Sequence, residues 1–148
     1  MSRHWEVANA VARFFAAVDG CAWEELAALM APTIHLDYSS FGRPAADMTP
    51  AEVVAGWRGL LPGFDHTQHL LGNLDVTFDG AEASVRAAVI GTHVLDEEHW
   101  VVSGRYEMTL VESGGTWRLS MLRFLYAYQT GPVALVDDAT KRAAAQAV

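Results

Sequence analysis

Three polar side chains fall on strand faces that are otherwise apolar, which is where the reactive groups of a pocket would lie. Alternate residues of a strand point to the same side, so His93 shares a face with Val89. By the same alternation His69 lies beside Leu71, and Tyr38 ends a strand face that is otherwise apolar. An imidazole titrates near neutrality and can take a proton, and a phenol can donate to a carbonyl oxygen. These residue types therefore suit proton transfer on a small molecule.

The same residues have plainer structural interpretations. A histidine on an apolar face can be a core residue bonded to a backbone carbonyl, and Tyr38 can be a core ring with its hydroxyl at the surface. Asp19 ends the first predicted helix before Gly20, as in any Asp-Gly turn, so the pattern alone does not select it. His66 and His69 do not share a strand face and no acidic residue completes a ligand set, so no metal site is expected.

Two predicted helices precede the first predicted strand, and a third helix lies between that strand and the remaining strands. Apolar residues recur with helical spacing over residues 5–18 and again over 22–30, which predicts two short helices in tandem. Residues 49–52 read Thr-Pro-Ala-Glu, a capping box with proline at the first helical position. A third helix therefore begins there, and we expect it to stop at the Pro-Gly pair of residues 62–63.

Strand patterns fill most of the remaining chain. They cover residues 34–38, 66–71, 74–78, 83–95, 100–111 and 116–128. Helices followed by a run of antiparallel strands make an α+β plan, in which the helices pack on one face of a curved, cone-shaped sheet and its open end is a pocket. We expect one domain over residues 1–131 and a tail over 132–148 that forms a short helix, a lid or a disordered end.

Composition and charge exclude several classes of partner. The 148 residues include ten Lys and Arg against eighteen Asp and Glu, for a formal net charge of -8, and Lys141 is the one lysine. Scattered positive charge argues against nucleic acid and anionic membranes. No apolar run is long enough to span a bilayer and the start lacks the apolar segment of a signal peptide, so we expect a cytoplasmic protein. A single cysteine, Cys21, excludes an internal disulfide.

Three stretches of the sequence carry a family resemblance. They are residues 31–41 (APTIHLDYSSF), 49–52 (TPAE) and 67–72 (TQHLLG). Together they closely resemble the scytalone dehydratases, and the chain is similar to bacterial SnoaL-like members of the nuclear transport factor 2-like superfamily, over about residues 7–131. The resemblance implies a cystatin-like α+β barrel, a mixed but mainly antiparallel sheet with three helices on its concave face.

The resemblance also implies a set of site residues. The family's dehydratase site uses an aspartate just before the second helix, a tyrosine in the Asp-Tyr string, a histidine in the Thr-Gln-His string and a second histidine one strand later. At the matching positions this chain has Asp19, Tyr38, His69 and His93. Three of the four are the residues that strand alternation selects independently, and Asp19 is added by the resemblance.

The chain departs from the family pattern on the substrate side of the site. A second tyrosine of the family, immediately before the aspartate, is Val18 here, and a serine and an asparagine that face the substrate are Gly104 and Tyr106. These departures indicate a substrate different from that of the fungal enzyme. Phe41, Trp57 and Tyr106 are candidate pocket walls for a flat substrate, with plain core residues as the alternative.

Three functions fit these observations. The first is a carbon–oxygen lyase, a cofactor-independent dehydratase that acts on a hydroxylated ketone or a polycyclic or aromatic metabolite in an enclosed pocket. In it His69 moves the proton, Asp19 orients His69, Tyr38 donates to the carbonyl oxygen, and His93 binds substrate or a water. The second is an isomerase or polyketide cyclase of the same fold. The third is a non-catalytic small-molecule-binding or dimerisation module.

Self-association is the expected quaternary state. One sheet face lies under the helices, and Trp100, Trp117 and the outward positions of residues 122–128 are expected to form an apolar surface on the other. That surface predicts a homo-oligomer, and the resemblance implies a dimer or a trimer.

Overall fold

A computed structural model describes residues 1–147, in which four helices and two 3-10 turns combine with one six-stranded sheet. In chain order the elements are α1 (Arg3–Asp19), α2 (Trp23–Ala28), β1 (Met30–Asp37), η1 (Ser39–Phe41), β2 (Ala46–Met48), α3 (Pro50–Arg58), η2 (Leu61–Gly63), β3 (His66–Asp79), β4 (Glu82–Leu95), β5 (Glu98–Ser113), β6 (Thr116–Thr130) and α4 (Leu135–Gln146). None of the described helices is long and apolar enough to cross a membrane.

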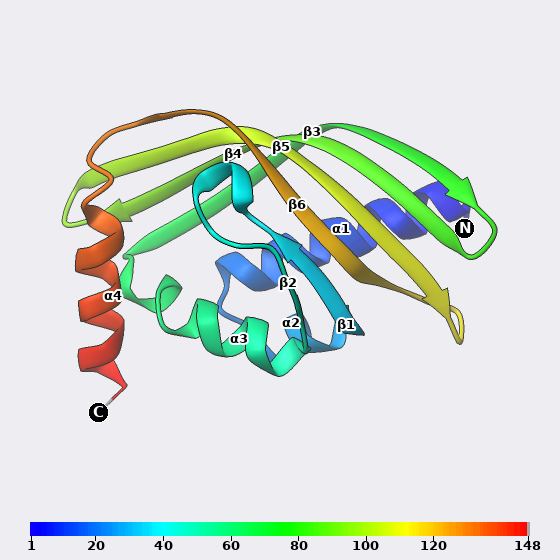
Figure 1. Ribbon diagram of the computed structural model, residues 1–148, viewed down its shortest axis with the longest axis horizontal. Coiled ribbons are helices and arrows are strands. Elements are labelled where there is room, and N and C mark those ends of the chain that lie inside the picture. Colours follow the sequence, from blue (N-terminus) through cyan, green and yellow to red (C-terminus); the bar gives the residue numbers. More distant parts are fainter. Residues whose placement is uncertain (148) are drawn as a thin grey trace.

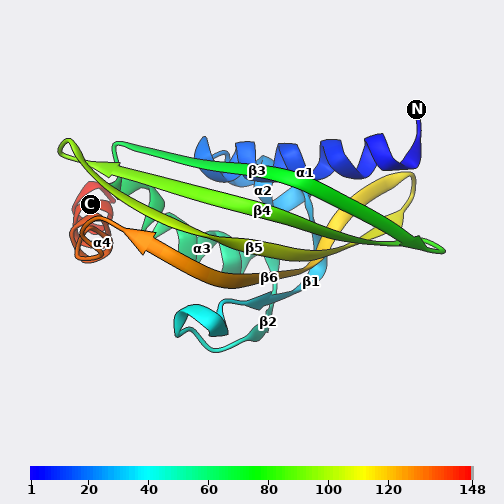
Figure 2. The same ribbon diagram turned by 90° about the horizontal axis from the view of Figure 1, so that it is seen from above.

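The sheet has the strand order β2-β1-β6-β5-β4-β3, and all neighbours are antiparallel except the parallel pair of β1 and β6. Figure 1 shows the long strands arching over α1, α2 and α3, with α4 standing at one end of the arch. Seen from above, α1 runs along the β3 edge and the short β1–β2 pair forms the opposite edge (Figure 2). The predicted α+β fold, a curved mixed sheet with helices on its concave face, is confirmed.

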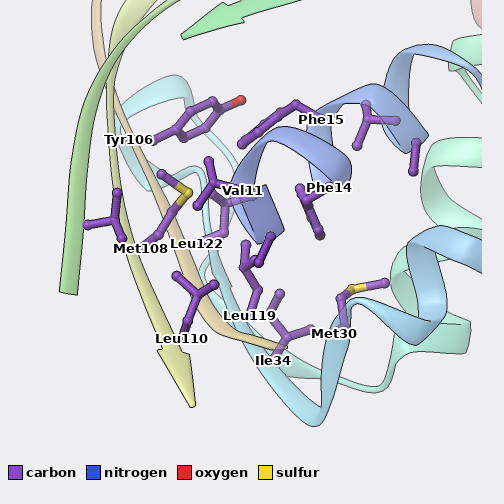
Figure 3. Close-up of a cluster of buried hydrophobic side chains, with 14 of the residues drawn as sticks. Val11, Phe14, Phe15, Met30, Ile34, Tyr106, Met108, Leu110, Leu119 and Leu122 are labelled. Carbon is purple, nitrogen blue, oxygen red and sulfur yellow. The ribbon is translucent and has the colours of Figure 1, made fainter. Parts of the chain in front are cut away.

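The helix α1 is the main partner of the sheet because one of its faces is wholly apolar. Its buried side chains pack against the concave faces of β5 and β6, as Figure 3 shows. Val11, Phe14, Met108, Leu119 and Leu122 are each at most 2 % exposed. Burial of each such side chain contributes about 1.5–3 kcal/mol to folding. This packing fixes the C-terminal end of α1 against the sheet.

The capping box at the start of α3 forms as predicted. The Thr49 hydroxyl accepts from the Glu52 amide at 3.3 Å, and the Thr49 amide donates to the Glu52 carboxylate at 2.7 Å. The preceding helix is shorter than the expected span of 22–30. It ends at Ala28, and Met30 already starts β1, with Pro32 lying in the stretch where the register of β1 against β6 shifts. A proline is tolerated at such an irregularity because its missing amide leaves no ladder bond unmade.

The separate strands predicted over 66–71 and 74–78 are a single strand, β3. Its register against β4 shifts between Gly72 and Asp75, and Asn73 adopts a positive φ of 54°. The glycine and asparagine therefore mark a bulge within one strand rather than a turn between two. His69 consequently lies within one long edge strand and not near the end of a short strand.

The C-terminal segment after Pro132 forms the helix α4, while Val148 lies outside the described residues. Leu135 and Ala139 of α4 pack against Phe64 and Trp100 in a second small core at the end of the sheet. The approach is closest at Gly63, where an added methyl group would overlap the backbone of Ala139. Glycine at this position is thus a steric requirement for the docking of α4.

We expect Gly63→Ala to lower the melting temperature by about 3–10 °C, because overpacking costs about 1–3 kcal/mol and the chain is of medium length. Thermal unfolding followed by circular dichroism measures the change. The matched control is Gly56→Ala in α3, where an added methyl meets nothing within 4 Å and should leave the melting temperature unchanged or raise it. An unchanged melting temperature for Gly63→Ala would show that α4 does not dock as described.

The two tryptophans expected on the outer face are buried inside. Trp100 and Trp117 are 5 % and 4 % exposed, because strand alternation turns both toward the concave side, where Trp100 meets His93. The outer face instead carries other apolar side chains: Leu70, Ile90 and Tyr128 are 63 %, 42 % and 51 % exposed and lie in one row across β3, β4 and β6 through Ser103 of β5. Self-association stays a prediction, and this row is the surface on which it now depends.

Candidate active site

A histidine and an aspartate from different elements form a hydrogen-bonded pair beside a cavity. Asp19 is the last residue of α1, and His69 projects from β3. The His69 ring nitrogen Nδ1 lies 2.7 Å from Asp19 Oδ1. The backbone amide of His69 donates to Oδ2 at 2.8 Å, and the Thr67 hydroxyl donates to Oδ1 at 3.1 Å. Three donors therefore hold the carboxylate in place, two of them from His69 itself.

This arrangement sets the charge and the tautomer of the pair. Burial raises the pKa of Asp19, but the hydrogen bonds and charge of His69 and the Thr67 hydroxyl outweigh it, so the net pKa lies below its usual value. The carboxylate is therefore ionised and accepts from Nδ1–H of His69. The lone pair of the ring then resides on Nε2, the form in which an imidazole acts as a base.

The second histidine lies beside the first but has a different electrostatic character. The rings of His69 and His93 are 5.7 Å apart and nearly perpendicular. His93 Nδ1 donates to the Trp100 carbonyl at 3.3 Å, which leaves Nε2 as an acceptor. Burial, with the charge of His69 adding to it, lowers the pKa of His93 to about 4. His93 is thus a neutral hydrogen-bonding group at neutral pH, and of these two histidines His69 is the one with a carboxylate partner.

Two tyrosine hydroxyls meet on the wall of the same cavity. The Tyr38 and Tyr106 oxygens are 3.3 Å apart, and the Tyr106 ring stacks on Phe15 with centroids 5.0 Å apart. Burial raises the pKa of Tyr38 to about 12 and that of Tyr106 well above its usual value. Both phenols are therefore protonated donors. Tyr106 of β5 therefore supplies a second phenol beside Tyr38.

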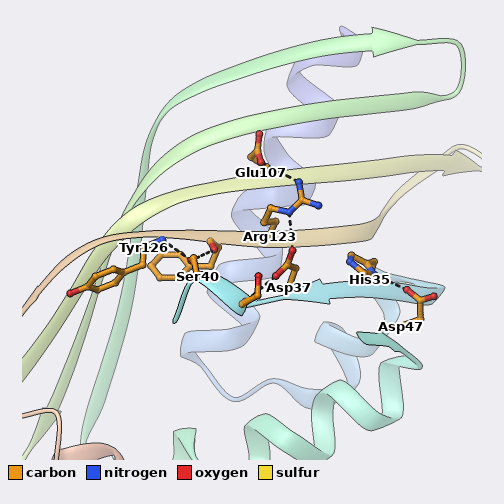
Figure 4. Close-up of polar contacts among 9 residues, drawn as sticks. His35, Asp37, Ser40, Asp47, Glu107, Arg123 and Tyr126 are labelled. Atoms are coloured by element: carbon orange, nitrogen blue, oxygen red, sulfur yellow. Dashed lines mark hydrogen bonds and ion pairs between the residues drawn. The ribbon is translucent and has the colours of Figure 1, made fainter. Parts of the chain in front are cut away.

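The segment that carries Tyr38 is clamped to the sheet (Figure 4). The Ser40 hydroxyl donates to the Phe124 carbonyl at 2.6 Å and accepts from the Tyr126 amide at 2.9 Å. On the other side of Tyr38, the Asp37 carboxylate accepts from the Ser39 amide and from Arg123. Hydrogen bonds from Ser39 and Arg123 hold the pKa of Asp37 at about 2, so this clamp stays ionised. The position of the Tyr38 ring is thereby fixed between two anchored neighbours.

These groups face a cavity of about 310 Å³. His69, His93, Tyr38 and Tyr106 line it, and so do the two further wall residues expected from the sequence, Phe41 and Trp57. Asp19 is not in the wall and lies behind His69. Most of the remaining lining is apolar: Phe15, Val18, Leu36, Leu60, Leu61, Val89, Trp100, Val102, Phe124 and Val136.

Sequence reasoning missed several lining residues. Arg43 comes from the loop after η1, and Val136 and Thr140 come from α4. Neither segment has a periodic pattern that assigns a face before the fold is known. Within residues 1–147 no three His, Cys, Asp or Glu side chains gather as a metal-ligand set.

The profile of the SnoaL-like domain matches residues 1–123 of the chain. The chain belongs to the SnoaL-like family. Within this SnoaL-like chain the matched region includes all four residues of the candidate site, together with Tyr106. No functionally curated protein matches the sequence.

Solved structures share the fold of this SnoaL-like chain at low sequence identity. The Kfla4162 protein of Kribbella flavida is 22 % identical, with 95 % of this chain and 96 % of that chain covered and a TM-score of 0.81. A "Putative Scytalone Dehydratase" of Novosphingobium aromaticivorans is 21 % identical, with 87 % of each chain covered and a TM-score of 0.74. The hexachlorocyclohexane dehydrochlorinase LinA-type3 of Novosphingobium barchaimii is 15 % identical, with 88 % and 90 % covered and a TM-score of 0.75. At these identities the likeness shows the fold alone.

Proposed function

We propose that this protein is a cofactor-independent dehydratase that removes water from a hydroxylated ketone with a flat, largely apolar body. The observation that carries the proposal is the Asp19–His69 pair, joined at 2.7 Å, whose imidazole lines a cavity that also presents two protonated phenols. Elimination beside a carbonyl needs a base, an oxyanion donor and an acid for the leaving hydroxyl. The pair and the phenols supply these three groups.

The reaction follows from the charges of the site. Nε2 of His69 takes the proton from the carbon next to the carbonyl, and the electron pair of that C–H bond forms an enolate whose oxygen accepts from Tyr38. The enolate then collapses to a carbon–carbon double bond, the carbon–hydroxyl bond breaks, and His69 returns its proton to the departing hydroxide. Water and an unsaturated ketone result, and His69 is again neutral. Asp19 stabilises the intermediate imidazolium.

The remaining groups suit orientation of the substrate. The neutral His93 has an acceptor at Nε2 that can bind the substrate hydroxyl or a water, and it does not compete as a cation with His69. Trp57 and Phe41 present aromatic faces suited to a planar ring system. A cavity of about 310 Å³ lies at the small end of the range for ligand pockets, which favours a bicyclic over a larger polycyclic substrate.

We expect the protein to convert bicyclic β-hydroxy ketones, with 3-hydroxy-1-tetralone as the first probe, to products that have lost one water. Mass spectrometry of the reaction against a protein-free control measures the loss. A product that has the mass of the substrate in ordinary water, and that carries deuterium when the reaction is run in heavy water, would assign the same base to an isomerase. Binding of the probes without turnover or deuterium exchange would contradict catalysis and favour a small-molecule-binding module.

A further inference from the structure

Arg43 lies at the cavity with its backbone anchored beside Tyr38. The chain turns at Gly42, which adopts a left-handed φ of 87°, and the Arg43 amide then donates to the Tyr38 carbonyl at 3.2 Å. The Arg43 residue is exposed and yet contributes to the cavity lining. The hydrogen bond from Tyr106 and the positive charge of Arg43 offset part of the rise in pKa that burial causes at Tyr38. The charge of Arg43 therefore acts at the phenol side of the cavity.

The Arg43 side chain has no partner among the described residues, in contrast to most other cations of the chain. Arg13, Arg86, Arg123 and Arg142 pair with carboxylates. A further three have other contacts: Arg3 and Arg58 lie over aromatic rings, and Arg118 donates to a backbone carbonyl. In a chain with a net charge of -8, acceptors for a surface guanidinium are plentiful. An unpaired cation at the cavity that holds the candidate site is therefore a distinctive feature.

The cavity wall makes that cation effective. Among the described lining residues there is no aspartate or glutamate, and Arg43 is the one side chain with a permanent charge. The carboxylate of Asp19 lies behind His69 and is bound by three donors. An anionic group in the cavity would thus meet a guanidinium without a facing carboxylate. A guanidinium can bind a carboxylate through two parallel hydrogen bonds.

We propose that Arg43 binds a carboxylate of the substrate at the cavity mouth and so makes the protein selective for carboxylated hydroxy ketones. The part of this inference that names a hydroxy ketone rests on the proposed function. The binding of a carboxylate by Arg43 is independent of it. The anion would be held on the Tyr38 side, and the ring body would extend along Trp57 toward His69. Arg43 is in this view a specificity-determining residue, and the proton is moved by His69.

The test compares 2-naphthoate with 2-naphthamide, an uncharged probe of nearly the same shape, by isothermal titration calorimetry at about pH 8 and low ionic strength, where screening is weak. We expect the wild-type protein to bind 2-naphthoate about 10- to 100-fold more tightly than the amide, the range for a charge-assisted pair. Arg43→Gln should abolish this preference, and Arg43→Lys should keep part of it because it retains the charge without the planar fork.

Arg105→Gln is the matched control, because Arg105 is also exposed and without a partner among the described residues but lies outside the cavity lining. It removes the same charge, and the preference for 2-naphthoate should survive. Equal binding of the two probes by the wild-type protein, no binding of 2-naphthoate, or an equal loss in Arg43→Gln and Arg105→Gln would overturn the proposal. The titration needs no turnover, so its failure is distinguishable from failure of the dehydration assay.

Discussion

Replacing His69 by glutamine is expected to lower the rate of dehydration by about 10²- to 10⁴-fold, the usual contribution of a positioned acid–base group. The amide of glutamine can still donate to Asp19, which is 2.7 Å from the imidazole, so the local packing survives. It has no lone-pair nitrogen that can take a proton from carbon. Initial rates with a converted β-hydroxy ketone, together with a thermal melt that reports folding, measure the effect.

Asp19→Asn extends the same prediction, because the two residues act as one unit. An asparagine cannot stabilise the imidazolium and can present its amide to Nδ1, which favours the wrong tautomer of His69. We expect a loss of similar size, and the double variant should be no slower than His69→Gln alone. Thr67→Val is the control, because it removes one donor to Asp19 at 3.1 Å and leaves both contacts with His69. Multiplicative losses in the double variant, or full activity in either single one, would refute the pair as the base.

The parts of the fold that local pattern determines were predictable from the sequence. Strand alternation placed His69 and His93 on inward faces, and the capping box located the start of α3, because both signals depend on neighbours within a few residues. The bulge at Gly72 was not predictable, since a glycine next to an asparagine is equally typical of a turn between strands. The inward direction of Trp100 also follows alternation. Its strand carries apolar residues on both faces, however, so the pattern alone does not say which face points inward.

The composition of the site depends on contacts that are remote in sequence. Tyr38 and Tyr106 are 68 residues apart and meet only because β1 lies next to β6 and β6 next to β5 in the sheet. The pairing of Asp19 with His69 spans 50 residues and was suggested by family resemblance rather than by pattern. Arg43 lies in a loop without periodicity. These residues become neighbours through the order of the strands in the sheet, which a short stretch of sequence does not determine.

The expected loss on removing the Tyr38 hydroxyl is the second large effect. Only one of two hydroxyls 3.3 Å apart can donate to the other, so one O–H remains free for the substrate. Tyr106 is 3 % exposed, and its ring is held between Phe15 and Phe124, whereas Tyr38 is half-buried. We infer that Tyr106 donates to Tyr38 and that Tyr38 donates to the enolate oxygen. Donation into Tyr38 polarises its own O–H and strengthens the bond to the substrate.

Tyr38→Phe should therefore lower kcat by about 10²- to 10³-fold, the usual cost of an oxyanion donor, and Tyr106→Phe by only about 10-fold. Both substitutions keep the ring and its packing, and Tyr128→Phe, at an outward-facing tyrosine that is 51 % exposed, is the matched control without an effect. Steady-state kinetics that separate kcat from KM decide which of the two tyrosines donates to the enolate oxygen and which donates to the other tyrosine. Equal large losses at the two positions would mean that both phenols donate directly to the oxyanion, and an unchanged kcat in Tyr38→Phe would remove the phenols from the mechanism.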